Sequence, residues 1–207
     1  MTIPAKYQDV GEGTIASYNF TDIASGEGFV RFYAARLSGS DILTGNVVYS
    51  DTIETASNFV DTADTPVLVS TFNFDTTKFN LPRRMGGTAI VSIPAEIAST
   101  SATAQVTAFL KIVKADGTVV DLISGSGKFA TSSSQEKMFS FSLVVPTTLI
   151  KKEDKIRLSV EQWRVDTSGS PAASTHYIGH DPKNRAAPTI TTIDTNLIMD
   201  VPFRIDL

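Results

Sequence analysis

The sequence predicts an all-β protein, folded as an antiparallel β-sandwich with an N-terminal extension or arm. Threonine and serine supply 46 of the 207 residues, a bias that suits solvent-facing strand positions and turns and lowers helix propensity. Apolar and polar side chains alternate in several segments, which is the pattern of half-buried strands. The connections between these segments are too short for helices, so neighbouring strands are expected to pair antiparallel.

The chain divides into two parts. Residues 67–207 hold six or seven strand patterns at the spacing of a sandwich and form the predicted core. Residues 1–66 combine glycine-rich turns with short aromatic runs. Two alternatives remain open for this N-terminal segment: it supplies outer strands of the sandwich, or it is an arm that packs on a neighbouring subunit.

The predicted strands follow from the alternation. In chain order they are residues 15–20, 29–37, 67–74, 88–93, 104–114, 118–124, 137–145, 155–165 and 197–207. The apolar faces are clearest at Val106, Ala108, Leu110 and Ile112, at Phe139, Phe141 and Leu143, and at Ile156, Leu158 and Val160. Trp163 lies on the polar side of its strand, which marks either the end of the strand or an outward face that is covered.

Turns and breaks separate these strands. Asp116-Gly117 between two apolar runs predicts a hairpin. Pro146 is expected to end the strand before it, and residues 95–100 are the one short stretch that favours a helix. Loops are predicted at residues 125–136, 166–174 and 181–184, which are rich in glycine, serine or proline.

The last strand pattern, residues 197–207, alternates without interruption. It contains Pro202, which has no N–H to donate to a neighbouring strand. This strand is therefore expected at an edge of the sheet, or with its proline directed outward, where it offers a contact to a subunit or a capsid.

Composition excludes several classes of protein. The chain has no cysteine, which removes disulfides and thiolate metal sites. Its formal net charge is −4 and its basic residues are scattered, so direct nucleic-acid binding is not expected. The first residues do not form a secretory signal, and no apolar run approaches the length of a membrane span. We therefore expect synthesis in a cytoplasm and no membrane contact.

His176 and His180 are the strongest candidates for chemistry. On a helix, spacing of four would align two imidazoles for one metal ion, but on a strand it separates them by about 13 Å. Gly179 and Thr175 disfavour a helix. The sequence therefore favours a surface strand that turns at Asp181-Pro182 over a metal site.

Other candidate groups have simpler interpretations. Gly125-Ser126-Gly127 lacks the pattern of a nucleophile elbow, and the adjacent acids Glu153-Asp154 resemble a solvated turn more than two acids across a cleft. Loop aspartates that could bind calcium lack the spacing of a known calcium loop; they are Asp61, Asp64, Asp75 and Asp166. We therefore assign no catalytic, cofactor-binding or metal-binding residue, expect no cofactor, and expect that the protein is not an enzyme.

Two sets of side chains favour binding over catalysis. Arg83 and Arg84 precede Gly86-Gly87, which lacks phosphate-loop spacing, so the arginines are candidates for ion pairs between subunits. Four aromatic residues are candidates for a binding surface: Trp163, Tyr177, Tyr33 and Tyr49. They either form a platform for sugars or fill the core or a subunit interface.

Residues 139–160 resemble a pattern common in jelly-roll sandwiches: a strand, a bend that begins at a proline, a charged turn and another strand. Residues 14–28 and 32–35 resemble structural proteins of tailed bacteriophage particles.

The resemblance implies a jelly-roll-like virion protein that decorates or cements the capsid. Such a protein would be made in the host cytoplasm and would contact the major capsid protein or other virion proteins. We expect it to act as a homotrimer or another homo-oligomer. The alternative function is that of a carbohydrate-binding module or a fibre-type adhesion domain.

Overall fold

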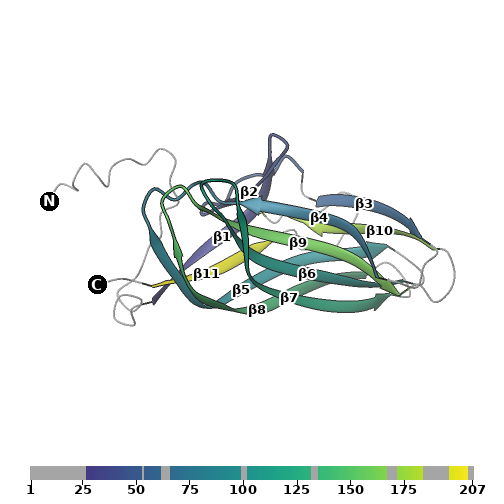
Figure 1. Ribbon diagram of the computed structural model, residues 1–207. Helices are drawn as coiled ribbons and strands as arrows, with labels where there is room; N and C mark the ends of the chain where they lie inside the picture. Colours follow the sequence, from purple (N-terminus) through teal and green to yellow (C-terminus); the bar gives the residue numbers. More distant parts are fainter. Residues whose placement is uncertain are drawn as a thin grey trace.

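The computed structural model describes residues 27–52, 54–61, 66–98, 102–131, 135–166, 172–183 and 196–204. These residues form eleven strands and no helix, which confirms the predicted all-β sandwich (Figure 1). The strands are β1 (Glu27–Leu37), β2 (Ser40–Thr44), β3 (Glu54–Asp61), β4 (Val67–Asp75), β5 (Arg83–Ala98), β6 (Ala102–Val113), β7 (Val119–Thr131), β8 (Gln135–Ile150), β9 (Lys155–Asp166), β10 (Ala172–Gly179) and β11 (Ile198–Arg204).

The strands form one hydrogen-bonded path that folds over into two layers. The order along this path is β3-β10-β5-β11-β1-β2-β4-β9-β6-β7, and β8 pairs with the other edge of β5. One layer holds β8, β5, β11, β1, β10 and β3, and the other holds β4, β9, β6 and β7. The short strand β2 joins them through a parallel bridge between Ile42 and Asp75, whereas every other described pair is antiparallel, as predicted.

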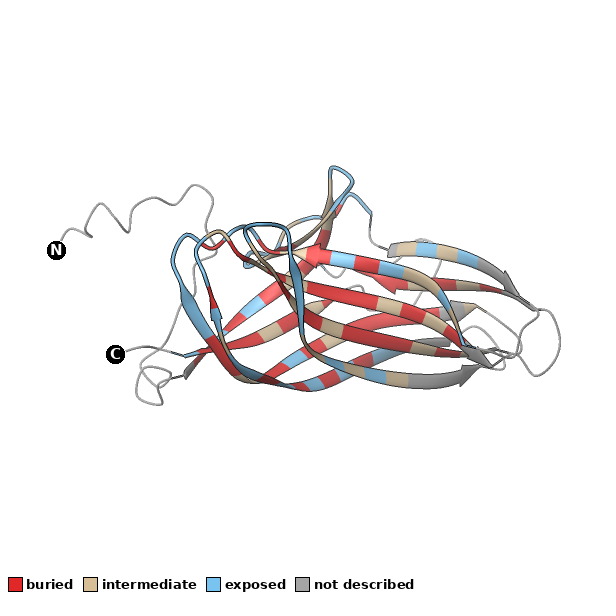
Figure 2. Ribbon diagram, viewed as in Figure 1, coloured by how far each residue is buried: buried red, intermediate tan, exposed pale blue. Residues whose placement is uncertain are grey.

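The core lies between the two layers. The predicted apolar faces point inward: Val106, Leu110 and Ile112 on β6, and Ile156, Leu158 and Val160 on β9, are at most 1% exposed. Strand β8 contributes Phe139, Phe141 and Leu143 from the opposite layer. Figure 2 shows the resulting alternation of buried and exposed positions along the strands.

The predicted loop at residues 125–136 is wrong over most of its length. Strand β7 continues to Thr131, and β8 begins at Gln135; residues 132–134 lie outside the described part of the chain. A Cβ atom on Gly125 would lie 2.8 Å from Leu143 Cδ2, and one on Gly127 would lie 2.8 Å from Phe139 Cδ1. The glycines therefore serve close packing between the two layers rather than chain flexibility.

The predicted helix at residues 95–100 is also wrong over its described residues. Strand β5 extends to Ala98 and pairs on both edges, with Ala95 opposite Lys137 of β8 and Ile178 of β10. Pairing on both edges satisfies the backbone of this segment, and it outweighs the weak helical preference of alanine and glutamate.

Two prolines are accommodated by irregular pairing. Pro146 does not end its strand: β8 continues to Ile150, and the register with β5 shifts between Met85 and Gly87. Pro202 does not mark an edge, because β11 lies between β1 and β5. The β11–β5 register shifts between Asp200 and Phe203, so the missing N–H of Pro202 falls in an irregularity where no ladder hydrogen bond is needed.

The N-terminal segment contributes strands to the same sheet. Its described residues form β1, β2 and β3, and the predicted strand at residues 15–20 lies outside the described part of the chain. Of the loop predicted at residues 166–174, residues 167–171 also lie outside it, and the prediction is wrong at residues 172–174, which begin β10 and pair with β3. The turn predicted after His180 is present, since Asp181 Oδ1 accepts a hydrogen bond from the Lys183 backbone N–H at 3.0 Å. Within the described ranges, no helix exists that could cross a membrane.

Candidate functional site

The outward side of the layer formed by β6, β7 and β9 carries a shallow depression of about 280 Å³. We call this surface the polar face. Its lining residues are Gln105, Thr107, Phe109, Ser124, Gly125, Ser126, Glu161 and Trp163. Seven of these eight residues occupy outward-facing positions of three adjacent strands, and the eighth is Gly125.

The register of the strands explains why these side chains meet. Glu161 of β9 lies opposite Thr107 of β6, which lies opposite Ser126 of β7. Trp163 lies opposite Gln105 in the next row. Opposite side chains in antiparallel strands are close neighbours, so each row across the three strands forms one continuous strip of surface.

Hydrogen bonds hold parts of the polar face in position. The indole Nε1–H of Trp163 donates to Glu161 Oε2 at 2.9 Å. The Gln105 amide Nε2–H donates to Thr107 Oγ1 at 3.1 Å. Trp163 is partly exposed, so one tryptophan is oriented at the surface by a carboxylate on its own strand.

A charged row borders the polar face. Arg157 contacts Asp75 with two hydrogen bonds of 2.6 and 2.9 Å, and Lys111 lies 3.2 Å from Asp121. The bond to Asp75 raises the pKa of Arg157. The Lys111 ammonium also lies 4.7 Å from the centre of the Phe109 ring. The charges in this row are therefore paired with one another, and the depression beside them contains Glu161 as the one charged lining residue.

The opposite layer presents a different outward surface, which we call the apolar face. It is defined by Phe29 of β1, Ile90 of β5, and Met138 and Val144 of β8, which are 52%, 42%, 40% and 71% exposed. Ile90 and Val144 are diagonal neighbours, because Ile90 lies opposite Ser142 and Thr88 opposite Val144.

An ion pair lies on the same side of that layer. Arg31 of β1 donates two hydrogen bonds of 2.8 Å to the Asp200 carboxylate of β11, and Asp200 lies opposite Ile90. The apolar face thus combines exposed large apolar side chains with a pre-formed charged pair.

The predicted surface position of the histidines is wrong. His176 is 1% exposed and His180 is fully buried. The strand prediction itself is confirmed, because His176 belongs to β10 and His180 follows its end. Both side chains therefore point into the sandwich, where the sequence pattern led us to expect solvent.

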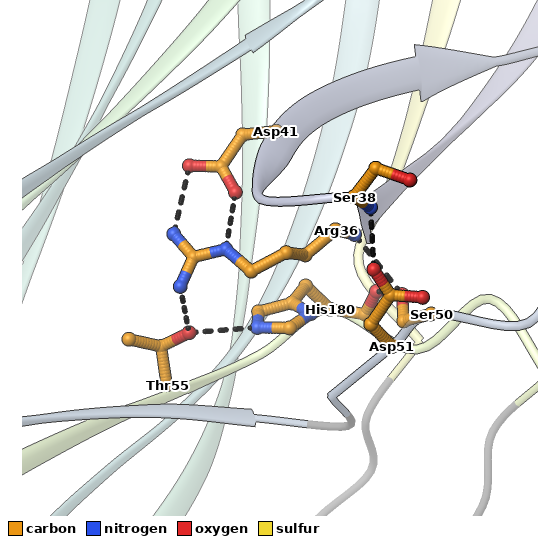
Figure 3. Close-up of polar contacts among 7 residues, drawn as sticks. All are labelled: Arg36, Ser38, Asp41, Ser50, Asp51, Thr55 and His180. Carbon is orange, nitrogen blue, oxygen red and sulfur yellow. Dashed lines mark hydrogen bonds and ion pairs between the residues drawn. The ribbon is translucent and has the colours of Figure 1, made fainter.

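His180 belongs to a polar cluster that joins three strands (Figure 3). Its Nε2 atom lies 2.9 Å from Thr55 Oγ1, which also accepts a hydrogen bond from Arg36 at 3.0 Å. Arg36 in turn holds Asp41 through bonds of 2.7 and 3.1 Å. The His180 carbonyl oxygen accepts a bond from Ser50 Oγ at 2.8 Å.

The pKa values of both histidines are low. Burial, together with the charge of Arg36, lowers the pKa of His180 to about 4, although Asp41 opposes this. Burial and the charge of Arg164 lower the pKa of His176 to about 4. Both imidazoles are therefore neutral at pH 7. In the described ranges, no group of three or more His, Cys, Asp or Glu residues is placed to hold a metal ion.

The other sequence candidates are placed apart from one another. Asp154 is buried and accepts hydrogen bonds from the backbone N–H groups of Ala115 and Lys151 at 3.1 and 2.9 Å. Its neighbour Glu153 has a φ of 69° and contacts Lys78 at 3.1 Å. This acidic pair therefore organises a turn between strands.

The structure also places Gly87, the two arginines before it and some of the aspartates considered for calcium binding. Gly87, with a φ of 125°, lies against the ring of Pro202. Arg83 and Arg84 are exposed at the start of β5. Among the loop aspartates, Asp75 is engaged by Arg157. The side chains of Asp61, Asp64 and Asp166 lie outside what the structure describes.

The four aromatic candidates do not share one surface. Trp163 lines the depression on the polar face, whereas Tyr49 is 62% exposed elsewhere, with the Lys183 ammonium 4.8 Å from its ring centre. Tyr33 and Tyr177 belong to strands of the other layer. Sequence reasoning found Trp163 and weighed Ser126 only as a nucleophile. It missed Gln105, Phe109 and Ser124, because the proximity of these residues depends on strand register.

Comparison with known proteins supports the fold. No family model and no curated protein matches the chain. Among solved structures, an α-amino acid ester hydrolase aligns over 84% of this chain with a TM-score of 0.61 and 11% identity. An aminopeptidase from a marine sediment archaeon, Thaumarchaeota archaeon, aligns over 87% with a TM-score of 0.62 and 9% identity.

The chain corresponds to 36% and 37% of the length of these two hydrolase chains, so it spans about a third of each. Infectious bursal disease virus and a protein described as a CBM4 also align, both with a TM-score of 0.35. At these identities, the comparisons show a shared sandwich fold.

Proposed function

We propose that the protein is a non-enzymatic virion structural protein that decorates or cements a capsid, and that it docks through the apolar face. The observation that carries this proposal is the exposure of Phe29, Ile90, Met138 and Val144 on one layer of the sandwich. Isolated exposed apolar side chains are common, but Ile90 and Val144 are diagonal neighbours on this surface, and adjoining exposed apolar side chains are typical of an interaction site.

The composition of the apolar face suits a protein partner. Interfaces combine a core of large apolar side chains with a polar rim, and the Arg31–Asp200 pair lies beside Ile90. A stable interface of this kind buries more than about 1,000 Å² in total. The partner that we propose is the surface of the major capsid protein, consistent with the resemblance of residues 14–28 and 32–35 to phage particle proteins.

The alternative function, a carbohydrate-binding module or fibre-type adhesion domain, would use the polar face. The two faces belong to opposite layers, so the two roles do not compete for one surface. As a non-enzymatic protein, the chain would use its buried histidines for stability and its outward faces for contacts.

Substitution on the apolar face tests the proposal. Particles would be produced with the wild-type protein, with Ile90→Asp and Val144→Asp together, or with Ser124→Asp and Ser126→Asp together. The last variant adds the same two charges to the opposite layer. We expect the Ile90/Val144 variant to be at least tenfold depleted from purified particles by quantitative mass spectrometry, and those particles to lose resistance to heat and osmotic shock.

The control variant should be retained at the wild-type copy number. Equal retention of both variants would exclude docking through the apolar face. Equal resistance of particles with and without the protein would exclude the cementing role. Circular dichroism of each purified variant separates a loss of docking from a loss of folding.

A further inference from the structure

The polar face has hydrogen-bonding capacity that the protein itself does not use. Glu161 Oε1, the hydroxyl groups of Ser124 and Ser126, and Gln105 Oε1 accept or donate no hydrogen bond within the described part of the structure. They lie in rows that converge on one depression. A carboxylate, an amide and hydroxyl groups together offer both donors and acceptors to a ligand.

An aromatic ring accompanies these polar groups. Trp163 is partly exposed, and its hydrogen bond to Glu161 limits the orientations that the indole can adopt. The indole is apolar on its faces and polar only at its N–H. Because the N–H is already occupied, the exposed part of the ring offers an apolar surface beside hydrogen-bond groups.

This combination matches the chemistry of sugars. A pyranose ring presents a flat face of C–H groups, which packs against an aromatic ring, and a rim of hydroxyl groups, which both donate and accept hydrogen bonds. Binding sites in general combine apolar surface with a few well-placed polar groups. On the polar face, Trp163 provides the apolar surface, and Glu161, Ser124 and Ser126 provide the polar groups.

The length and charge of the polar face restrict the class of ligand that it can bind. Gln105 and Phe109 are four residues apart on β6, so the face extends about 13 Å along the strands. The depression is open and shallow, which suits a section of an extended chain better than an enclosed small molecule. Glu161 is the one charged lining residue, so it would repel glycans that carry carboxylates or sulfates.

We infer that the polar face is a binding site for neutral oligosaccharides, with Trp163 as the stacking platform and Glu161, Ser124 and Ser126 as hydrogen-bonding groups. The site is independent of docking through the apolar face, because it lies on the other layer. A decorating protein with this site would present a glycan-binding surface outward from the particle.

Ligand binding to the polar face can be followed by fluorescence. Trp163 is the single tryptophan of the chain, so intrinsic tryptophan fluorescence reports on the proposed site alone. The purified full chain would be titrated with cello-, xylo- and chito-oligosaccharides, and with an oligogalacturonate as the acidic counterpart. We expect at least one neutral series to shift or quench the emission saturably, and the acidic series to bind at least tenfold more weakly.

Variants locate the site by calorimetry with the best ligand. Trp163→Ala should weaken binding at least tenfold. Ser126→Leu, which adds a large side chain at an exposed lining position of β7, should weaken it similarly. Val144→Ser on the opposite layer should bind as the wild type does.

Two results would exclude oligosaccharide binding at the polar face. No saturable fluorescence change with any neutral series, or unchanged affinity in both polar-face variants, would overturn the inference. If Trp163→Ala fails to fold, Ser126→Leu decides alone. Failure of glycan binding leaves the particle experiment with the Ile90/Val144 variant unaffected, so the two proposals fail separately.

Discussion

The two histidines show how a residue's environment determines its chemistry. Gly179 and Thr175 predicted a strand for this segment, which is correct. They did not predict the burial of the histidines, because the local sequence is the same for a buried and an exposed histidine. His180 is buried because Thr55 and Arg36 come from the distant strands β3 and β1 and complete its contacts. Such partners cannot be identified from local sequence.

Burial of the histidines predicts a loss of stability in mild acid. Their pKa values are about 4 in the folded protein and about 6.5 when unfolded. The unfolded chain therefore binds more protons between these values, so the free energy of unfolding should fall as the pH decreases from about 6.5 to 4. The expected loss is about 3 kcal/mol per histidine at most.

Urea unfolding at pH 7.5, 6, 5 and 4 measures this loss. The midpoint should decline through this range, and the decline should become shallower in His176→Gln and in His180→Gln. A midpoint that is the same at pH 7.5 and pH 5 would contradict the prediction.

Glycine 127 provides a test of packing between the layers. A Cβ atom there would lie 2.8 and 3.0 Å from the Phe139 ring atoms, so Gly127→Ala should destabilise the fold by about 1–3 kcal/mol. Gly45→Ala is the matched control, because a Cβ atom at Gly45 meets no atom within 4 Å. Chemical denaturation of both variants measures the difference, and equal midpoints would show that β7 and β8 do not pack as closely as described.

At the scale of elements, the alternation of apolar and polar residues predicted most strands well. The prolines and glycines, which were expected to end strands or form loops, led to wrong predictions. The inward rows of β6, β8 and β9 follow directly from the period of two, because one face of each strand is buried. Pro146, Pro202 and the glycines of β7 were interpreted by their local preferences. Each instead meets a specific partner strand, through a register shift or a close approach, and local sequence contains no information about that partner.

The central position of β11 leads to a further prediction. Met199 is fully buried in this strand, so Met199→Ala should cost about 2–5 kcal/mol. Arg204→Ala, at the exposed end of the same strand, should change stability by no more than about 0.5 kcal/mol. Thermal unfolding compares the two, and a small effect at Met199 would contradict the burial of this side chain in the core.

At the scale of the whole molecule, the sandwich separates two surfaces of different chemistry. One layer presents the apolar face and the other presents the polar face with its single tryptophan. The alternation in the sequence predicted which residues of many strands face outward, and Trp163 was identified as a candidate for sugar binding. It did not predict which outward positions would share a surface, because this depends on the order β8-β5-β11-β1 in one layer and β4-β9-β6-β7 in the other.

The pairing of β1 with β11 also has a consequence for synthesis. Strand β1 pairs with β2 soon after it is synthesised, but Glu27 lies opposite Arg204, so β1 meets its second neighbour only after β11 has left the ribosome. Contacts between such distant parts of a chain make folding slow. A nascent chain that ends before residue 198 should therefore remain sensitive to protease, with its apolar strands accessible to chaperones until the last strand is released.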